Sequence, residues 1–69
     1  MGTRKLVVQD DAAEYIGVRP QTLANWRYLG IGPRYFKLGR GAVRYDLADL
    51  DAYLEANAHD PGADREPAA

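Results

Sequence analysis

The sequence predicts a small, mainly α-helical domain with one β-hairpin, in the order helix, tight turn, helix, hairpin, helix. Three observations predict this fold class. Apolar residues recur at helical spacing in three short segments, glycine, proline or a capping residue bounds each segment, and two β-rich runs flank a glycine-containing loop. With 69 residues, the chain has room for one small domain only.

The first helix is predicted from about Asp10 to Ile16, because acidic residues in its opening turns favour the positive end of the helix dipole. Gly17 follows the last apolar position and suits the left-handed conformation that ends a helix. Pro20 fits the first position of a second helix, where its missing N–H costs nothing. Two short helices joined by such a turn form a helix-turn-helix.

The second helix is predicted over residues 20–29, with Leu23 and Trp26 on its inner face. Its exposed side then holds the polar residues Arg19, Gln21, Thr22 and Asn25. In a helix-turn-helix the second helix enters the major groove, and its N-terminal residues contact base edges. Arg pairs with guanine, Gln and Asn pair with adenine, and Thr contacts a base, a phosphate or a thymine methyl. These four residues are therefore predicted to read bases. The alternative is that they only form the solvent-exposed polar face that any soluble helix has.

A β-hairpin is predicted next, with Gly39, Arg40 and Gly41 at its tip. An arginine at the end of a narrow arm can reach the minor groove, where the negative potential is enhanced, and flanking glycines allow a close approach. The alternative is an ordinary hairpin whose edge is protected by positive charge. Strand alternation predicts that Phe36 and Leu38 share one face of the first strand, opposite Tyr35 and Lys37. On the return strand, Val43 and Tyr45 are expected to face the core and Arg44 to point outward.

The third helix is predicted over residues 46–58, with Asp46 as its N-cap. One side of this helix is apolar, and the other carries Asp51 and Glu55. The predicted core draws on every element: Val7, Ala13, Ile16, Val18, Leu23, Trp26, Phe36, Leu38, Val43, Tyr45, Leu50 and Leu54. The folded domain is therefore expected over residues 6–57, between a flexible N-terminus (1–5) and a disordered acidic tail (58–69) that lacks large apolar residues.

Charge is segregated along the chain, although the net charge is only −1. Residues 19–45 hold six basic and no acidic residues, whereas residues 46–69 hold seven acidic residues and one arginine. Such asymmetry predicts a polyanionic partner, here double-stranded DNA. The predicted phosphate contacts are Arg27, Tyr28, Arg34, Lys37 and Arg44. The six basic residues of this region are expected to form one continuous cationic surface. Affinity should come mainly from their phosphate contacts, and about six such contacts predict a log–log salt slope near −5. They are Arg19, Arg27, Arg34, Lys37, Arg40 and Arg44.

Several functions are excluded or disfavoured by composition. The chain has no cysteine and one histidine, so thiolate and His-rich metal sites are excluded. No apolar run approaches the roughly 20 residues of a membrane span, and the N-terminus lacks the apolar stretch of a signal peptide. We expect a cytoplasmic protein of a bacterial host cell that is not an enzyme, with no cofactor, no metal, no small-molecule ligand and no membrane partner.

Six motifs, in this order and spacing, resemble the excisionase-type, MerR-like winged-helix proteins of phages and mobile elements. They are A-E-Y-I-G-V, T-L-x-x-W, G-I-G-P-R-Y, K-L-G-R-G, V-R-Y and D-L-x-x-Y-L, and the resemblance covers residues 6–57. It implies a winged helix-turn-helix (helix-turn-helix, hairpin wing, helix) that places the second helix in the major groove and the wing in the minor groove. It further implies a recombination directionality factor, which binds repeated sites beside a phage attachment site, bends the DNA and directs an integrase toward excision of the viral genome.

The sequence differs from this family at two places, and two other functions are alternatives to an excisionase. Val8 stands where a Ser or Thr cap is common, and Arg19-Pro20-Gln21 replaces a Ser-rich start of the second helix. The larger MerR-type regulators add a dimerisation helix and an effector domain, which we do not expect here. The alternatives are a small transcriptional regulator at an operator and, from another class, a protein-interaction adaptor that does not bind DNA. The segregated charge also predicts cooperative head-to-tail contact between copies on DNA.

Overall fold

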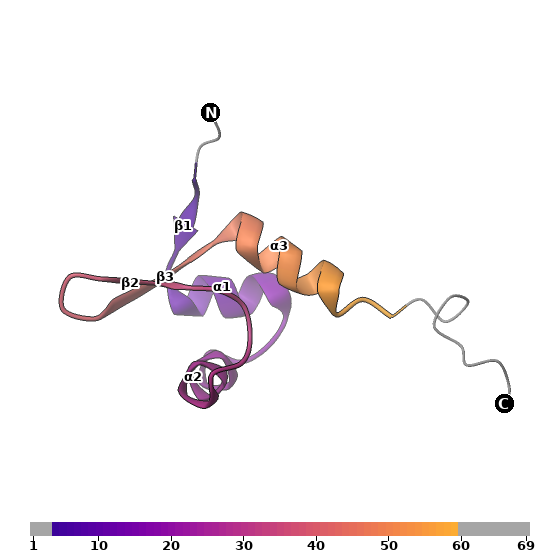
Figure 1. The fold of residues 1–69 in the computed structure, drawn as a ribbon, viewed down its shortest axis with the longest axis horizontal. Coiled ribbons are helices and arrows are strands. Elements are labelled where there is room, and N and C mark those ends of the chain that lie inside the picture. Colours follow the sequence, from indigo (N-terminus) through magenta and orange to yellow (C-terminus); the bar gives the residue numbers. More distant parts are fainter. Residues whose placement is uncertain (1–3, 60–69) are drawn as a thin grey trace, which may run out of the picture.

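Three helices and a three-stranded antiparallel sheet make up residues 4–59, the part of the chain that the computed structural model describes (Figure 1). The elements are β1 (Leu6–Val7), α1 (Gln9–Ile16), α2 (Pro20–Leu29), β2 (Phe36–Leu38), β3 (Ala42–Asp46) and α3 (Leu47–Ala56). Helices α1 and α2 form the helix-turn-helix, and β2 and β3 form the wing. The fold is a winged helix-turn-helix, which confirms the predicted fold class.

Helices α1 and α2 are joined by a three-residue turn, as the sequence predicts. Gly17 caps α1 in the left-handed conformation (φ 81°), and Pro20 is the first residue of α2. Ala12 and Ala13 are fully buried, and their small side chains let a neighbouring element approach α1 closely. Val8, at the N-cap of α1, makes no side-chain hydrogen bond to the helix.

The sheet has the order β1-β3-β2, with β3 in the centre. Strand β1 was not predicted, because two residues carry no periodicity and their partners lie far along the chain: Leu6 pairs with Asp46 and Val7 with Tyr45. The Lys5 carbonyl accepts a hydrogen bond from the Leu47 amide at 3.0 Å, so the chain is also held just before β1. Residues 1–3 of the predicted N-terminal segment and residues 60–69 of the predicted tail lie outside the described residues.

The wing has two faces, and the sequence prediction assigned the wrong face of its first strand to the core. Register pairs Phe36 with Arg44, Lys37 with Val43 and Leu38 with Ala42. Directly opposed residues of an antiparallel pair share a face. We therefore define the outer face as Phe36, Leu38, Ala42 and Arg44, and the inner face as Tyr35, Lys37, Val43 and Tyr45. The prediction that Phe36 and Leu38 join Val43 and Tyr45 in the core is wrong, whereas the outward direction of Arg44 is confirmed.

The core consists of five buried residues, Ala12, Ala13, Leu23, Tyr45 and Leu50, against which Val7, Ile16, Val18, Trp26, Val43 and Leu47 pack. Two predicted core leucines lie elsewhere. Leu38 is 43% exposed because it belongs to the outer face of the wing. Leu54 is 40% exposed because the neighbouring Tyr53 takes the inward position on α3, with its ring 5.7 Å from that of Trp26.

The loop from α2 to the wing is fitted closely against Trp26. Gly32 has a φ of 92°, and a Cβ atom there would lie 3.0 Å from the Trp26 Cβ and 3.1 Å from its Cε3. Both the backbone conformation and the space therefore require glycine. The next residue, Pro33, is buried. This loop fixes where the wing starts relative to the end of α2.

Asp46 joins the wing to α3. Its Oδ1 accepts a hydrogen bond from the Ala48 amide at 3.0 Å, which confirms the predicted N-cap, and its Oδ2 pairs with Arg4 Nη1 at 3.0 Å. We expect Asp46→Ala to lower the free energy of unfolding by about 2 kcal/mol, since it removes a cap from a nearly buried site. Asp46→Asn keeps the capping oxygen and loses only the ion pair to the half-exposed Arg4, which is worth about 1 kcal/mol or less. Urea unfolding measures the free energy of unfolding of both variants. An equal loss of stability in the two would mean that the helix cap is not the main contribution of Asp46.

Candidate nucleic-acid interface

The four predicted base readers lie at the start of α2. Arg19 is the N-cap of this helix and is exposed, as are Gln21 and Asn25, while Thr22 is half-buried. The opposite side of the helix is anchored by Leu23, which is fully buried. The first two turns of α2 therefore present an arginine, two amides and a hydroxyl away from the core, which is the set of groups that reads base edges in the major groove.

Gln21 and Asn25 bond to each other in the free protein. They lie one helical turn apart, and Gln21 Nε2 donates to Asn25 Oδ1 at 3.1 Å. A bidentate contact with adenine uses the oxygen and an N–H of the same amide. Because an amide oxygen has two lone pairs, Asn25 Oδ1 can accept from Gln21 and from an adenine N6–H at the same time, so the amide pair can stay closed when DNA binds.

Arg27 lies at the junction between α2 and the sheet. Its Nη1 donates to Gln9 Oε1 at 2.6 Å and to the Tyr45 hydroxyl at 3.1 Å. Its guanidinium carbon lies 5.7 Å from the centre of the Tyr35 ring, and the Tyr35 and Tyr45 rings are 6.1 Å apart. One nitrogen of this predicted phosphate contact is therefore engaged within the protein, and Nη2 and Nε carry the remaining N–H groups.

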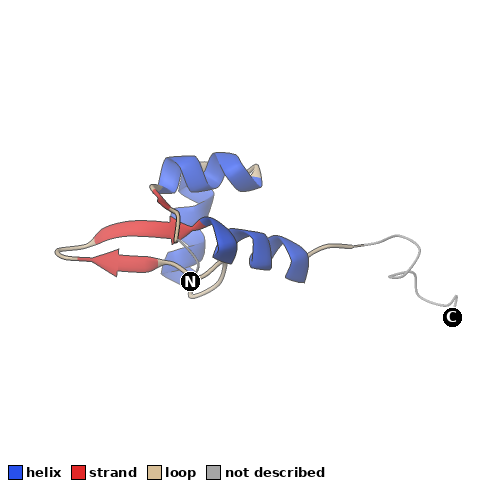
Figure 2. Cartoon of the chain, turned by 90° about the horizontal axis from the view of Figure 1, so that it is seen from above, coloured by secondary structure: helices blue, strands red, loops and turns tan. Residues whose placement is uncertain are grey.

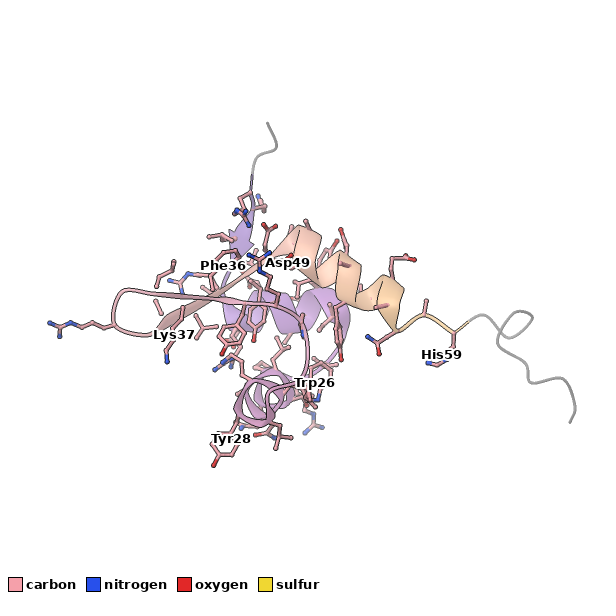
Figure 3. All side chains as sticks on the ribbon, in the orientation of Figure 1. Trp26, Tyr28, Phe36, Lys37, Asp49 and His59 are labelled. Carbon is pink, nitrogen blue, oxygen red and sulfur yellow. The ribbon has the colours of Figure 1, made fainter. Side chains whose placement is uncertain are left out.

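The other end of α2 carries exposed apolar side chains. Tyr28 is 89% exposed and points away from the body of the protein, as Figure 3 shows. Leu29 and Ile31, which follow it, are also exposed. The Tyr28 hydroxyl is accessible for the phosphate contact that the sequence predicts.

Arg40 occupies the tip of the wing, which projects as a two-stranded arm away from the helices (Figure 2). Gly39 and Gly41 flank it with φ values of 52° and 117°, and the Gly41 amide donates to the Leu38 carbonyl at 2.9 Å. A Cβ atom at either glycine would meet nothing within 4 Å, so these glycines serve the sharp turn and not close packing. The tip is a narrow, exposed arginine-bearing turn, as predicted.

The predicted cations do not form one continuous surface. Lys37 lies on the side of the wing toward α2, whereas Phe36 and Asp49 lie on the opposite side (Figure 3). Arg34 goes with the latter, because its Nη1 is 3.9 Å from Asp49 Oδ1 and its guanidinium carbon is 5.1 Å from the centre of the Phe36 ring. Arg44 shares this outer face and donates to the Val43 carbonyl at 2.8 Å. Counting charges along the sequence does not reveal this separation. Strand alternation places neighbouring cations on opposite faces of the wing, and Asp49 of α3 lies beside Arg34.

Three residues contact Arg27 or the outer face of the wing without having been predicted to do so. Gln9 and Tyr45 hold Arg27, and Arg4 lies 5.0 Å from the centre of the Phe36 ring, which Arg34 also covers. These contacts join residues far apart in the chain, so no local pattern marks them. The unexpected pairing of β1 with β3 is what places Arg4 beside the wing.

A comparison with protein-family models assigns the chain to a family. A model described as a helix-turn-helix domain matches residues 9–58, which include all three helices and the wing. The chain belongs to this helix-turn-helix family. Membership indicates a small DNA-binding protein whose partner is double-stranded DNA. A search of curated proteins found no match to this helix-turn-helix chain.

Two kinds of feature are absent from residues 4–59, the part of the chain that the structure describes. No helix in that range is long and apolar enough to cross a membrane. The same range contains no group of three or more His, Asp or Glu side chains arranged to hold a metal ion.

Proposed function

We propose that the protein is a sequence-specific binder of double-stranded DNA, with α2 in the major groove and the wing tip in the adjacent minor groove. One observation carries this proposal: the inner face of the wing, with Lys37, lies on the same side of the molecule as α2 (Figure 3). One duplex can therefore meet the base-reading groups of α2 and the arginine-bearing arm together.

The two parts of the interface are expected to respond differently to substitution. Asn25→Ala should cost about 1–3 kcal/mol of binding free energy on the preferred site and relax the preference at one base position, because an amide that reads an adenine edge is lost. Arg40→Ala should weaken binding to all duplexes alike. Selection from random-sequence duplexes, followed by affinity measurements, separates the two effects. Glu14→Gln, an exposed change on α1, is the control, and failure of the unaltered protein to bind any duplex in dilute buffer would refute the proposal.

The finer role that we propose is that of an excisionase, a non-enzymatic recombination directionality factor of a phage or mobile element. The resemblance of six motifs over residues 6–57 supports it. In this role the protein works in the cytoplasm of a bacterial host cell, binds repeated sites near an attachment site, bends the DNA and directs an integrase toward excision. Excision frequency in cells with and without the gene tests the role. Unchanged excision together with altered transcription of a neighbouring gene would instead assign a small transcriptional regulator.

Binding to repeated sites also follows from the size of the domain. One module of this kind buries only about 600–1,000 Å² against DNA, so neighbouring copies would supply affinity that one copy lacks. The exposed acidic residues Asp51 and Glu55 of α3 are suited to contact the basic region of the next copy. Asp51 already accepts a hydrogen bond from the Tyr15 hydroxyl at 2.7 Å, which raises the pKa of Tyr15.

Cooperativity on DNA tests this head-to-tail contact. The double variant Asp51→Lys/Glu55→Lys is expected to bind a single site as well as the unaltered protein and to lose cooperativity on two tandem sites. Gel-shift titrations on both duplexes measure the difference. Undiminished cooperativity in the double variant would exclude the acidic face of α3 from the contact.

A further inference from the structure

The wing and α2 must be held at a fixed angle if one duplex is to meet both. Within residues 4–59, Arg27 makes the only side-chain hydrogen bond between α2 and the sheet, the bond of 3.1 Å from its Nη1 to the Tyr45 hydroxyl. The other N–H of Nη1 goes to Gln9 Oε1, in the first turn of α1. A single nitrogen thus connects α2, α1 and β3, the central strand of the sheet.

The surroundings of Arg27 restrict its movement further. Tyr45 is 1% exposed, so the hydroxyl that accepts the hydrogen bond is carried by a ring that is buried in the core. Tyr35, on the loop that leads into β2, lies 5.7 Å below the guanidinium carbon and contacts the Tyr45 ring at 6.1 Å. The guanidinium is therefore held by two hydrogen bonds on Nη1 and by an aromatic face.

We propose that Arg27 is a positioning residue, which fixes the wing relative to α2 through Tyr45 and Gln9. A phosphate contact through its Nη2 edge is compatible with this role, because Nη1 alone makes the internal bonds. The role explains why an arginine stands at a half-buried position on α2. It also predicts that the contribution of the wing tip to DNA binding depends on residues buried far from the tip.

The first test needs no DNA. The chain has no cysteine, so spin labels at Gln21→Cys and Arg40→Cys report the distance between α2 and the wing tip without interference. Tyr45→Phe, which removes only the hydroxyl, and Arg27→Met should each widen the distance distribution to about twice its original width. Tyr15→Phe removes a tyrosine hydroxyl that bonds to Asp51 elsewhere and should leave the width unchanged. Unchanged widths in both test variants would overturn the proposal.

The second test rests on the proposed DNA binding and uses a double-mutant cycle. Arg40→Ala should weaken binding about tenfold in the unaltered protein but only about twofold in the Tyr45→Phe background, because a wing that is not held contributes little. In the Tyr15→Phe background the loss should stay about tenfold. An equal loss in all three backgrounds would overturn the positioning role. If the unaltered protein binds no duplex, the proposed function fails, and the spin-label distances still decide the role of Arg27.

Discussion

Raising the salt concentration from about 50 to about 200 mM should weaken duplex binding about 150-fold. The four cations on the side of α2 and at the wing tip are expected to touch phosphates: Arg19, Arg27, Lys37 and Arg40. Each phosphate contact adds about −0.9 to the slope of log K against log [salt], so four contacts give a slope of about −3.6. Counting all six cations of residues 19–45, as the sequence suggests, gives about −5.4 and a loss of about 1,800-fold.

Charge-removing variants on the two faces of the wing distinguish the slope expected for four phosphate contacts from the slope expected for six. Lys37→Gln, on the inner face, should make the slope shallower by about 0.9, because one phosphate contact is lost. Arg34→Gln, which removes the same charge beside Asp49 and Phe36, should leave the slope unchanged. Titrations of one duplex at five or six salt concentrations measure both slopes. An equal effect of the two variants would mean that both faces of the wing contact phosphates, as one continuous cationic surface requires.

The helices could be predicted from the sequence because their signals are local. Residues 20–29 were assigned correctly as α2, since Pro20 fits the first helical position and Gly30 follows the last. Asp46 was found as the cap of α3 for the same reason: a capping side chain acts on an amide two residues away. The base-reading positions followed directly, because once Leu23 faces inward, helical geometry decides which neighbours are exposed.

The sheet could not be predicted to the same depth, because its determinants are not local. Alternation separates the two faces of a strand but does not say which face meets the core. Here the register between β2 and β3 puts Lys37, not Phe36, on the face of the buried Tyr45. Hydrophobicity favoured Phe36 for the core, yet its ring lies under the guanidinium groups of Arg4 and Arg34. The contacts of Arg27 were hidden for the same reason, since they depend on where β3 lies relative to two helices.

Leu23→Ala is expected to lower the free energy of unfolding by about 3 kcal/mol. The side chain is fully buried in a core of five residues, so its loss leaves a cavity that few neighbours can fill. In a domain of this size, about 3 kcal/mol corresponds to a fall in Tm of roughly 12–24 °C. Since total stabilities of small domains are often only about 5 kcal/mol, the variant should also be partly unfolded at 37 °C. Circular dichroism during heating and in urea measures both quantities.

Leu38→Ala removes the same atoms from a residue that the sequence alone also assigns to the core. Because Leu38 is 43% exposed on the outer face of the wing, its truncation should cost only about 0.5 kcal/mol. The pair of variants therefore tests the register of the wing and not only the burial of one leucine. If the register shifted by one residue, Leu38 would turn toward the core and Lys37 away from it. A loss at Leu38 as large as that at Leu23 would require this shifted register, and with it Lys37 would no longer lie on the side of α2 that is proposed to meet DNA.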